Sequence, residues 1–142
     1  MNRDDIDHKN YTLISPETPL ISNLSMIENI ALIKEVHEFL STQKAEKIAF
    51  EELKRLSLEE IAEKRLIACS PNEILYVMII RALMMPQKSI LLQTPYAIVN
   101  NLGDIKTILS NITQLEHIKD IMIIDVITNA HYYEGVTCSI VK

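Results

Sequence analysis

Residues that could hold phosphate groups are scarce in this chain of 142 residues. It has only two glycines, Gly103 and Gly135, and they are far apart. A phosphate-binding loop needs glycines close together, because its backbone must turn with positive φ and approach the phosphates closely. The sequence therefore contains no phosphate-binding loop of the usual kind.

The two cysteines, Cys69 and Cys138, also stand alone, with no CxxC spacing and no cluster of histidines beside them. A structural zinc site needs several such ligands at short spacings. We therefore expect no metal site and no cofactor. Both thiols are interpreted as buried and reduced, as in a cytosolic protein.

Two other groups could take part in chemistry. Asp125 interrupts an apolar run, and we expect it at the exposed end of a strand or bonded to a backbone amide, with a functional acid as the alternative. His131 stands beside Tyr132 and Tyr133, which predicts either an ordinary loop surface or a contact with a partner.

Composition indicates one globular domain. Hydrophobic residues make up 48% of the chain and charged residues 23%, as in ordinary packed proteins. The 14 basic residues against 19 acidic ones give a net charge of −5, which argues against a nucleic-acid surface. No apolar stretch approaches the ~20 residues that cross a bilayer. Residues 1–10 are polar and are expected to form a flexible tail rather than a signal peptide.

The N-terminal half predicts one strand and a helical block. Tyr11–Ile14 is a short strand candidate that ends before two prolines. Two serines followed three residues later by glutamate, in the pairs Ser25 and Glu28 and Ser57 and Glu60, match capping boxes. Apolar residues at helical spacing predict helices over Met26–Leu40, Thr42–Leu56 and Ser57–Arg65. Together these make a helical subdomain at about residues 25–65.

The C-terminal half predicts alternating helices and strands. Ser70-Pro71-Asn72-Glu73 is the strongest helix start in the chain. An almost entirely apolar helix follows, stops at Pro86 and is expected to be buried. Further elements are expected at Ser89–Leu92 (strand), about Asn101–Ser110 (helix), Ile121–Ile127 (strand) and Gly135–Val141 (strand). Strands joined by a crossover helix predict an α/β fold with a parallel sheet.

The order of these signals resembles the ATP-binding subunit of ABC transporters from just before the Q-loop onward. Ser70-Pro71-Asn72-Glu73 leads to Ile80-Arg81-Ala82-Leu83, and then to Ile90-Leu91-Leu92-Gln93-Thr94-Pro95. In that family an LSGGQ signature leads to a helix reading roughly RVAIARAL and a strand ending in LLLDEPT. The resemblance covers roughly Tyr11 to Ala130 and implies part of a P-loop NTPase-like (ABC ATPase) sheet with an α-helical subdomain.

The resemblance carries over few of the family's functional groups. Ser70 matches the signature serine, but Pro71 and Asn72 replace two glycines. Gln93 and Thr94 occupy the Walker B aspartate and catalytic glutamate positions, and Asn100 occupies the D-loop aspartate position. The family's Walker A loop would precede Met1, and the Q-loop glutamine and switch histidine have no counterpart at the expected places.

These replacements predict a chain with no catalytic residue. A neutral Gln93 cannot offset the charge of Mg²⁺, and Thr94 is a poor base near neutral pH. By the resemblance, Ser70 and Asn72 could only complete a nucleotide site on a partner subunit. The alternative is that Ser70 is simply an N-cap, because proline removes one of the N–H donors that glycine would offer.

The resulting expectation is a non-catalytic ABC-ATPase-like subunit in the cytoplasm, held on the inner face of the membrane where a permease binds it. It would act through protein contacts, with a second copy, an active ABC ATPase subunit or a permease as partner, because a sheet without the Walker A strand leaves an edge uncovered. The resemblance implies a docking surface at Pro16–Ser25 and the helices to Arg65. Three alternatives remain: a scaffold or regulator unrelated to transport, an ATPase subunit that binds ATP only when a partner supplies Walker A, and a decayed sequence that folds but does little.

Overall fold

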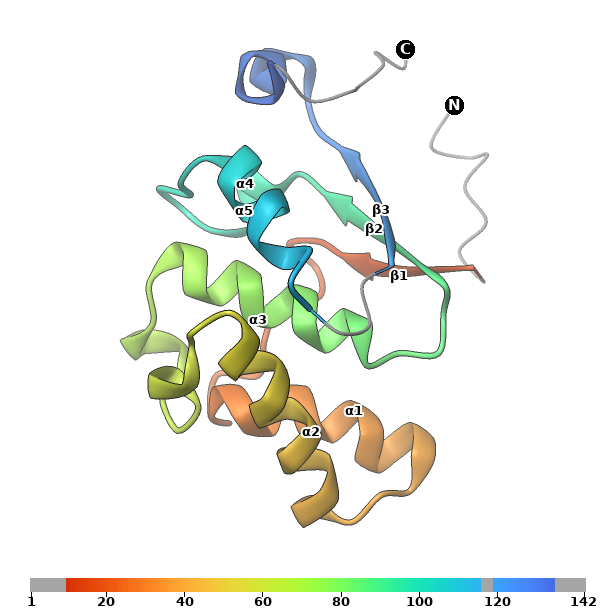
Figure 1. Cartoon of the computed structure of the whole chain (residues 1–142). Helices are drawn as coiled ribbons and strands as arrows, with labels where there is room; N and C mark the ends of the chain where they lie inside the picture. Colours follow the sequence, from red (N-terminus) through yellow and green to blue (C-terminus); the bar gives the residue numbers. More distant parts are fainter. Residues whose placement is uncertain (1–9, 116–118, 135–142) are drawn as a thin grey trace.

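The computed structural model describes residues 10–115 and 119–134, and within them it forms an α/β fold. Three parallel strands, β1 (Tyr11–Ile14), β2 (Ser89–Gln93) and β3 (Asp120–Ile124), lie in the order β1-β2-β3 (Figure 1). The prediction of an α/β fold with a parallel sheet is thus confirmed. The strand expected at Gly135–Val141 lies outside the described residues.

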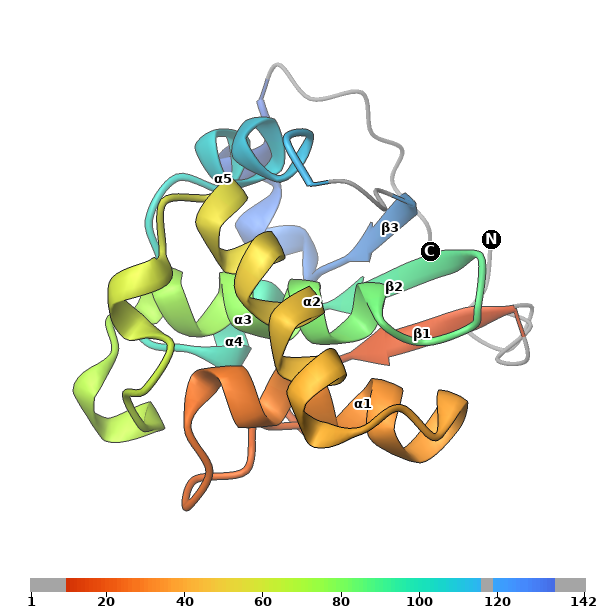
Figure 2. The ribbon, with the colours of Figure 1, turned by 60° about the horizontal axis from the view of Figure 1, so that its bottom comes forward.

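The connection from β1 to β2 is helical. It contains α1 (Met26–Glu38), α2 (Thr42–Arg55) and two short 3₁₀ turns, η2 (Glu59–Ile61) and η3 (Leu66–Ala68). Helix α3 (Pro71–Leu83) completes it. Helices α1 and α2 pack side by side, and α1 also contacts α3 (Figure 2). The capping boxes predicted at Ser25 and Ser70 are both formed.

The capping box predicted at Ser57 is wrong. Ser57 has a φ of 57°, and its N–H donates to the Lys54 carbonyl while the Leu58 N–H donates to the Leu53 carbonyl. This pair of bonds is the Schellman motif that closes a helix. Ser57 therefore ends α2 instead of starting a helix, and only the short turn η2 follows.

The connection from β2 to β3 contains α4 (Pro95–Ile98) and α5 (Ile105–Ile112), and η4 (Ile127–Tyr133) follows β3. Pro95 starts α4, because proline fits the first helical position. Helix α5 begins after Asp104, whose carboxylate accepts from the Lys106 N–H, and not near Asn101 as predicted.

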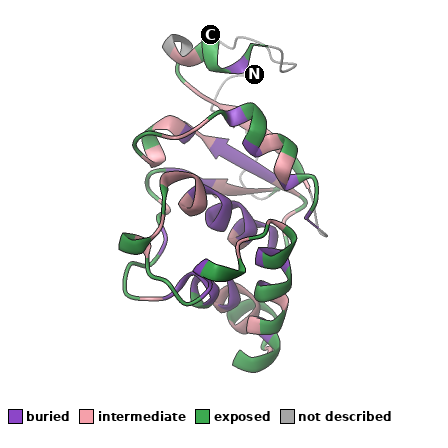
Figure 3. Cartoon of the chain, turned by 60° about the vertical axis from the view of Figure 1, so that its left-hand side comes forward, coloured by how far each residue is buried: buried purple, intermediate pink, exposed green. Residues whose placement is uncertain are grey.

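The core lies between the sheet and the helices. Figure 3 shows buried residues concentrated in α3 and in the central strand β2. Ile90 and Leu92 of β2 belong to one cluster with residues of α1, α3 and α5, and Ile121 and Ile123 of β3 pack against it. Because side chains alternate along a strand, Leu91 and its partners in register, Leu13 and Met122, lie on the other face of the sheet.

None of the described helices is both long and apolar enough to cross a bilayer.

Candidate functional site

The carboxyl ends of the strands are the first place to look for a site, because ligands of open parallel sheets bind there. Gln93 ends β2 and Ile124 ends β3. Helix α3 runs back along the sheet before β2, so its N-terminus reaches the same region. The Asn72 Oδ1 atom accepts a hydrogen bond of 2.8 Å from the Gly103 N–H, in the segment that follows β2. The structure therefore brings Asn72 to the loop between β2 and α5.

Ser70 acts as an N-cap, as the alternative interpretation predicted. Its Oγ accepts from the Glu73 N–H at 3.3 Å, and its own N–H donates to the Glu73 carboxylate at 2.8 Å. The capping box thus places a negative charge in the first turn of α3. A helix N-terminus favours anions, and here the carboxylate of Glu73 already occupies that position.

Asn72 fills the space beside Gly103. A Cβ atom at Gly103 would lie 2.8 Å from the Asn72 Nδ2 atom and 3.1 Å from its Oδ1 atom. The carboxamide oxygen is therefore used in a hydrogen bond within the chain. This contact could not be predicted from a local pattern, because the two residues are 31 positions apart.

The three residues that the resemblance compares with the Walker B and D-loop positions, Gln93, Thr94 and Asn100, are neutral. Gln93 is half-buried at the end of β2, and Asn100 is exposed in a turn. Thr94 has a φ of 47°, an unusual value for a β-branched residue. Its N–H donates to the Ile124 carbonyl at 2.7 Å, which extends the β2–β3 pairing by one bond.

Asp125 stands directly after β3 and binds its own neighbours. Its Oδ1 atom accepts from the Val126 N–H at 2.7 Å and from the Asn129 Nδ2 atom at 3.0 Å. Its Oδ2 atom accepts from the Tyr133 hydroxyl at 2.6 Å. The expectation that Asp125 bonds a backbone amide is confirmed. Burial, together with the Asp125 carboxylate, raises the pKa of Tyr133 far above its ordinary value.

An aromatic cluster covers this end of the molecule. The rings of Tyr96 and Tyr132 stack with centroids 4.2 Å apart, and Tyr133 meets Tyr96 edge-on at 6.4 Å. His131 lies 4.0 Å from Tyr132. The sequence indicated the three consecutive residues but not Tyr96, which comes from α4 and shares no pattern with them. The cluster joins α4 to η4 at the carboxyl edge.

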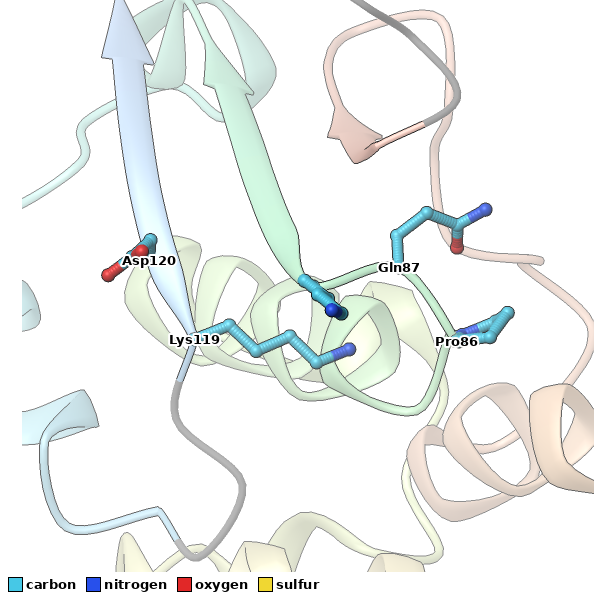
Figure 4. A pocket seen from close by; sticks show the side chains of 5 residues that line it. Pro86, Gln87, Lys119 and Asp120 are labelled. Atoms are coloured by element: carbon cyan, nitrogen blue, oxygen red, sulfur yellow. The ribbon is translucent and has the colours of Figure 1, made fainter.

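A concavity that was not predicted lies at the opposite, amino edge of the sheet. It has a volume of about 540 Å³ and is lined by Pro86, Gln87, Lys88, Lys119 and Asp120 (Figure 4). The Lys119 ammonium donates to the Met85 carbonyl at 2.6 Å. Burial and the nearby positive charge of Lys34 lower the pKa of Lys119. The two lysines and one carboxylate leave this concavity weakly positive.

The loop between β1 and α1 is fixed by side chains from two helices. Arg81 of α3 donates to the carbonyls of Pro19 at 2.9 Å and Thr18 at 2.5 Å. Asn29 of α1 accepts from the Ile21 N–H at 2.7 Å and donates to the carbonyls of Ile21, Leu24 and Ser25. The sequence left open whether Arg81 pairs with an acid or extends to the surface, and in the structure its guanidinium binds these two backbone carbonyls.

Among residues 10–115 and 119–134 no group of three or more His, Cys, Asp and Glu side chains could hold a metal ion. Cys69 is half-buried, and burial followed by the charge of Glu73 raises the pKa of its thiol. Cys138 lies outside the described residues. No protein-family model matches the chain, and no curated protein is significantly similar to it.

Proposed function

We propose that the chain is a non-catalytic relative of the ATP-binding subunit of ABC transporters that acts through protein–protein contacts. It would be an accessory or regulatory component of a transporter on the cytoplasmic side of a membrane. The observation that carries the proposal concerns the side chains at the carboxyl ends of the strands. Every side chain there that the resemblance assigns to nucleotide chemistry is either neutral or used in a hydrogen bond within the chain.

The scaffold supports the proposal at a coarse level. A helical block stands between the first two of three parallel strands, as the resemblance implies. Helix α3 begins at Ser70, and its N-terminus meets the segment after β2 through the bond between Asn72 and Gly103. The residues compared with the signature and with Walker B therefore lie at one end of the sheet.

The same geometry argues against ATP hydrolysis. Gln93 and Thr94 supply no carboxylate for Mg²⁺ or for an attacking water. Asp125, directly after β3, carries a carboxylate, and three donors already bind it. Glu73 adds a negative charge at the helix start where a phosphate of a partner's nucleotide would have to approach. The ATPase alternative, in which a partner supplies Walker A, is therefore the less favoured one.

The docking surface that we propose is the loop from Pro16 to Ser25 with the helices that follow it. Arg81 and Asn29 hold this loop in one conformation, so binding would require little ordering of its backbone. Ile21 presents an apolar side chain that is 42% exposed on it. A rigid loop with an exposed apolar residue suits contact with an active ATPase subunit or with the cytoplasmic loops of a permease.

The first test is nucleotide binding by the full chain. We expect titration with Mg·ATP up to millimolar concentration to give no heat of binding and no change in melting temperature. Micromolar affinity for ATP would contradict the proposal and favour the ATPase alternative.

The second test is site-specific photo-crosslinking in the source cell. A photoreactive phenylalanine analogue at Ile21 is expected to capture a P-loop ATPase subunit or a membrane permease. The matched control carries the analogue at Val126, which is 54% exposed and follows β3, the outer strand on the opposite side of the sheet from β1, and it should not capture that protein. If Ile21 captures only proteins of other classes, the transporter assignment fails and the scaffold alternative takes its place.

A further inference from the structure

The outer edge of β3 has no partner strand within the part of the chain that the structure describes, where β3 pairs only with β2. The Thr94 N–H donates to the Ile124 carbonyl, so the backbone groups of Ile124 point toward β2. Because these groups alternate along a strand, those of Met122 also point toward β2, whereas those of Ile121 and Ile123 point outward.

The composition of this edge is unusual for one that stays exposed. Natural edge strands carry lysine, proline, bulges or inward-pointing charges that discourage pairing with another chain. The four residues of β3 from Ile121 to Ile124 are all apolar. The opposite edge strand, β1, is one residue shorter and ends at a turn with proline. The edge of β3 is therefore the better template for pairing.

We infer that β3 pairs antiparallel with β3 of a second copy of this chain, which joins two three-stranded sheets into one sheet of six strands. The two-fold axis would pass through Met122, so that Met122 faces Met122 of the second copy. Ile121 and Ile123 would then exchange both N–H···O bonds with their counterparts across the axis. This inference rests on the sheet edge and not on the proposed transporter function.

Charge complementarity selects this register. Lys119 precedes β3 by one residue, and Asp125 follows it by one. With Met122 on the axis, Lys119 of each copy stands opposite Asp125 of the other, in addition to the bonds that each residue makes within its own chain, and all four apolar residues remain in the paired segment. Asp120 then stands opposite Ile124. A slip of two residues in either direction still leaves Asp120 opposite an apolar residue, and it also places either Lys119 or Asp125 opposite an isoleucine. Cross-strand pairs of opposite charge stabilise a sheet, whereas like charges destabilise it.

The decisive experiment is disulfide mapping in the full chain with Cys69→Ser and Cys138→Ser. Residues that face each other in a pair without hydrogen bonds have Cα atoms about 4.5 Å apart, close to the range that a disulfide spans. Met122→Cys should therefore give a covalent dimer under mild oxidation. The matched control is Ile124→Cys, because its two copies would be roughly 14 Å apart in this register and should give at most a tenth of that product.

Sedimentation velocity on the unmodified chain provides a test without any core substitution. We expect a species of twice 16.3 kDa at tens of micromolar. Lys119→Glu should raise the dissociation constant at least tenfold, because it brings like charges together across the interface. Lys88→Glu makes the same change of charge in the same concavity but off the strand, and should leave the constant within twofold of the unmodified chain.

Three outcomes would overturn the inference. One is a monomer at 100 µM. Another is equal crosslinking at positions 122 and 124. The third is a monomer whose Ile121 and Ile123 amides are protected from hydrogen exchange and lose that protection when residues 135–142 are deleted. In that last case the chain covers its own edge, and no second copy is needed.

Discussion

Two asparagines near helix starts hold neighbouring loops in very different ways. Asn29, only 1% exposed, makes four hydrogen bonds to the backbone of the β1–α1 loop and the start of α1. Asn72 is half-buried and binds the β2–α5 loop through the single N–H of Gly103. One buried side chain therefore holds the first loop through several hydrogen bonds. Asn72 contributes a single hydrogen bond to the second segment, which the ring of Tyr96 also joins to η4.

The largest effect should come from Asn29→Ala. The substitution leaves a buried N–H and several carbonyls of the loop without partners, and we expect it to lower the free energy of unfolding by about 3 kcal/mol. Urea denaturation monitored by circular dichroism would measure this loss. Asn23→Ala, in the same loop at an exposed position, is the control and should stay within about 0.5 kcal/mol of the unmodified chain. A small effect at Asn29 would remove the contrast between the two loops.

Arg81→Met should come next, with a loss of about 2 kcal/mol, because two hydrogen bonds from a charged donor disappear. Limited proteolysis should also cut the chain between residues 15 and 21 faster. Arg81→Lys keeps the charge but lacks the planar fork that reaches both carbonyls, so its stability should fall between those of Arg81→Met and the unmodified chain. If Arg81→Lys were as stable as the unmodified chain, the paired geometry of the two hydrogen bonds would contribute nothing.

Tyr133→Phe tests the hydrogen bond from the Tyr133 hydroxyl to the carboxylate of Asp125, which follows β3. Loss of the bond to the Asp125 carboxylate should cost about 1.5 kcal/mol at pH 8. The pKa of Tyr133 is raised in the folded state, so the stabilisation is complete below about pH 10, the pKa of tyrosine in the unfolded chain, and is lost as the pH rises above it. Unfolding free energies at pH 8 and pH 10.5 should therefore differ less in the variant than in the unmodified chain.

The control for that comparison is Tyr132→Phe, because Tyr132 is 40% exposed and contacts its neighbours through its ring. It should leave the difference between pH 8 and pH 10.5 as it is in the unmodified chain. If Tyr132→Phe and Tyr133→Phe reduced the stability difference between pH 8 and pH 10.5 equally, the assignment of this pH dependence to Tyr133 would be wrong.

The smallest effects on stability should come from changes to the hydrogen bond between Asn72 and Gly103. Asn72→Ala should cost about 1 kcal/mol, the typical value of one hydrogen bond. Gly103→Ala should cost a similar amount, because its Cβ would push the Asn72 carboxamide away. The double variant should then be no worse than either single one, since both remove the same interaction. Strict additivity in a double-mutant cycle would show that the two residues do not act together.

Local sequence signals predicted the elements well where neighbouring residues decide the structure. The capping boxes at Ser25 and Ser70 formed because all their partners lie within three residues. The same pattern at Ser57 failed, because the end of α2 had already fixed that residue in the left-handed region. A pattern of residue types cannot show whether a serine closes the preceding helix or opens the next one.

Contacts between distant residues could not be predicted in this way. Arg81 finds its carbonyl partners 62 and 63 positions away, and the Tyr96–Tyr132 stack joins two elements that share no sequence pattern. Asn72 reaches the loop after β2 through the Gly103 N–H. The sequence could not indicate this contact, because it depends on a glycine 31 residues away.

Thr94 shows where this chain could still be made more robust. A threonine with φ of 47° stands in a region that glycine and asparagine occupy far more readily, and holding it there costs on the order of 1 kcal/mol. Glycine or asparagine at this corner would relieve that strain and keep the N–H that binds the Ile124 carbonyl. Thermal tolerance can therefore be raised by engineering one backbone position, without repacking the interior.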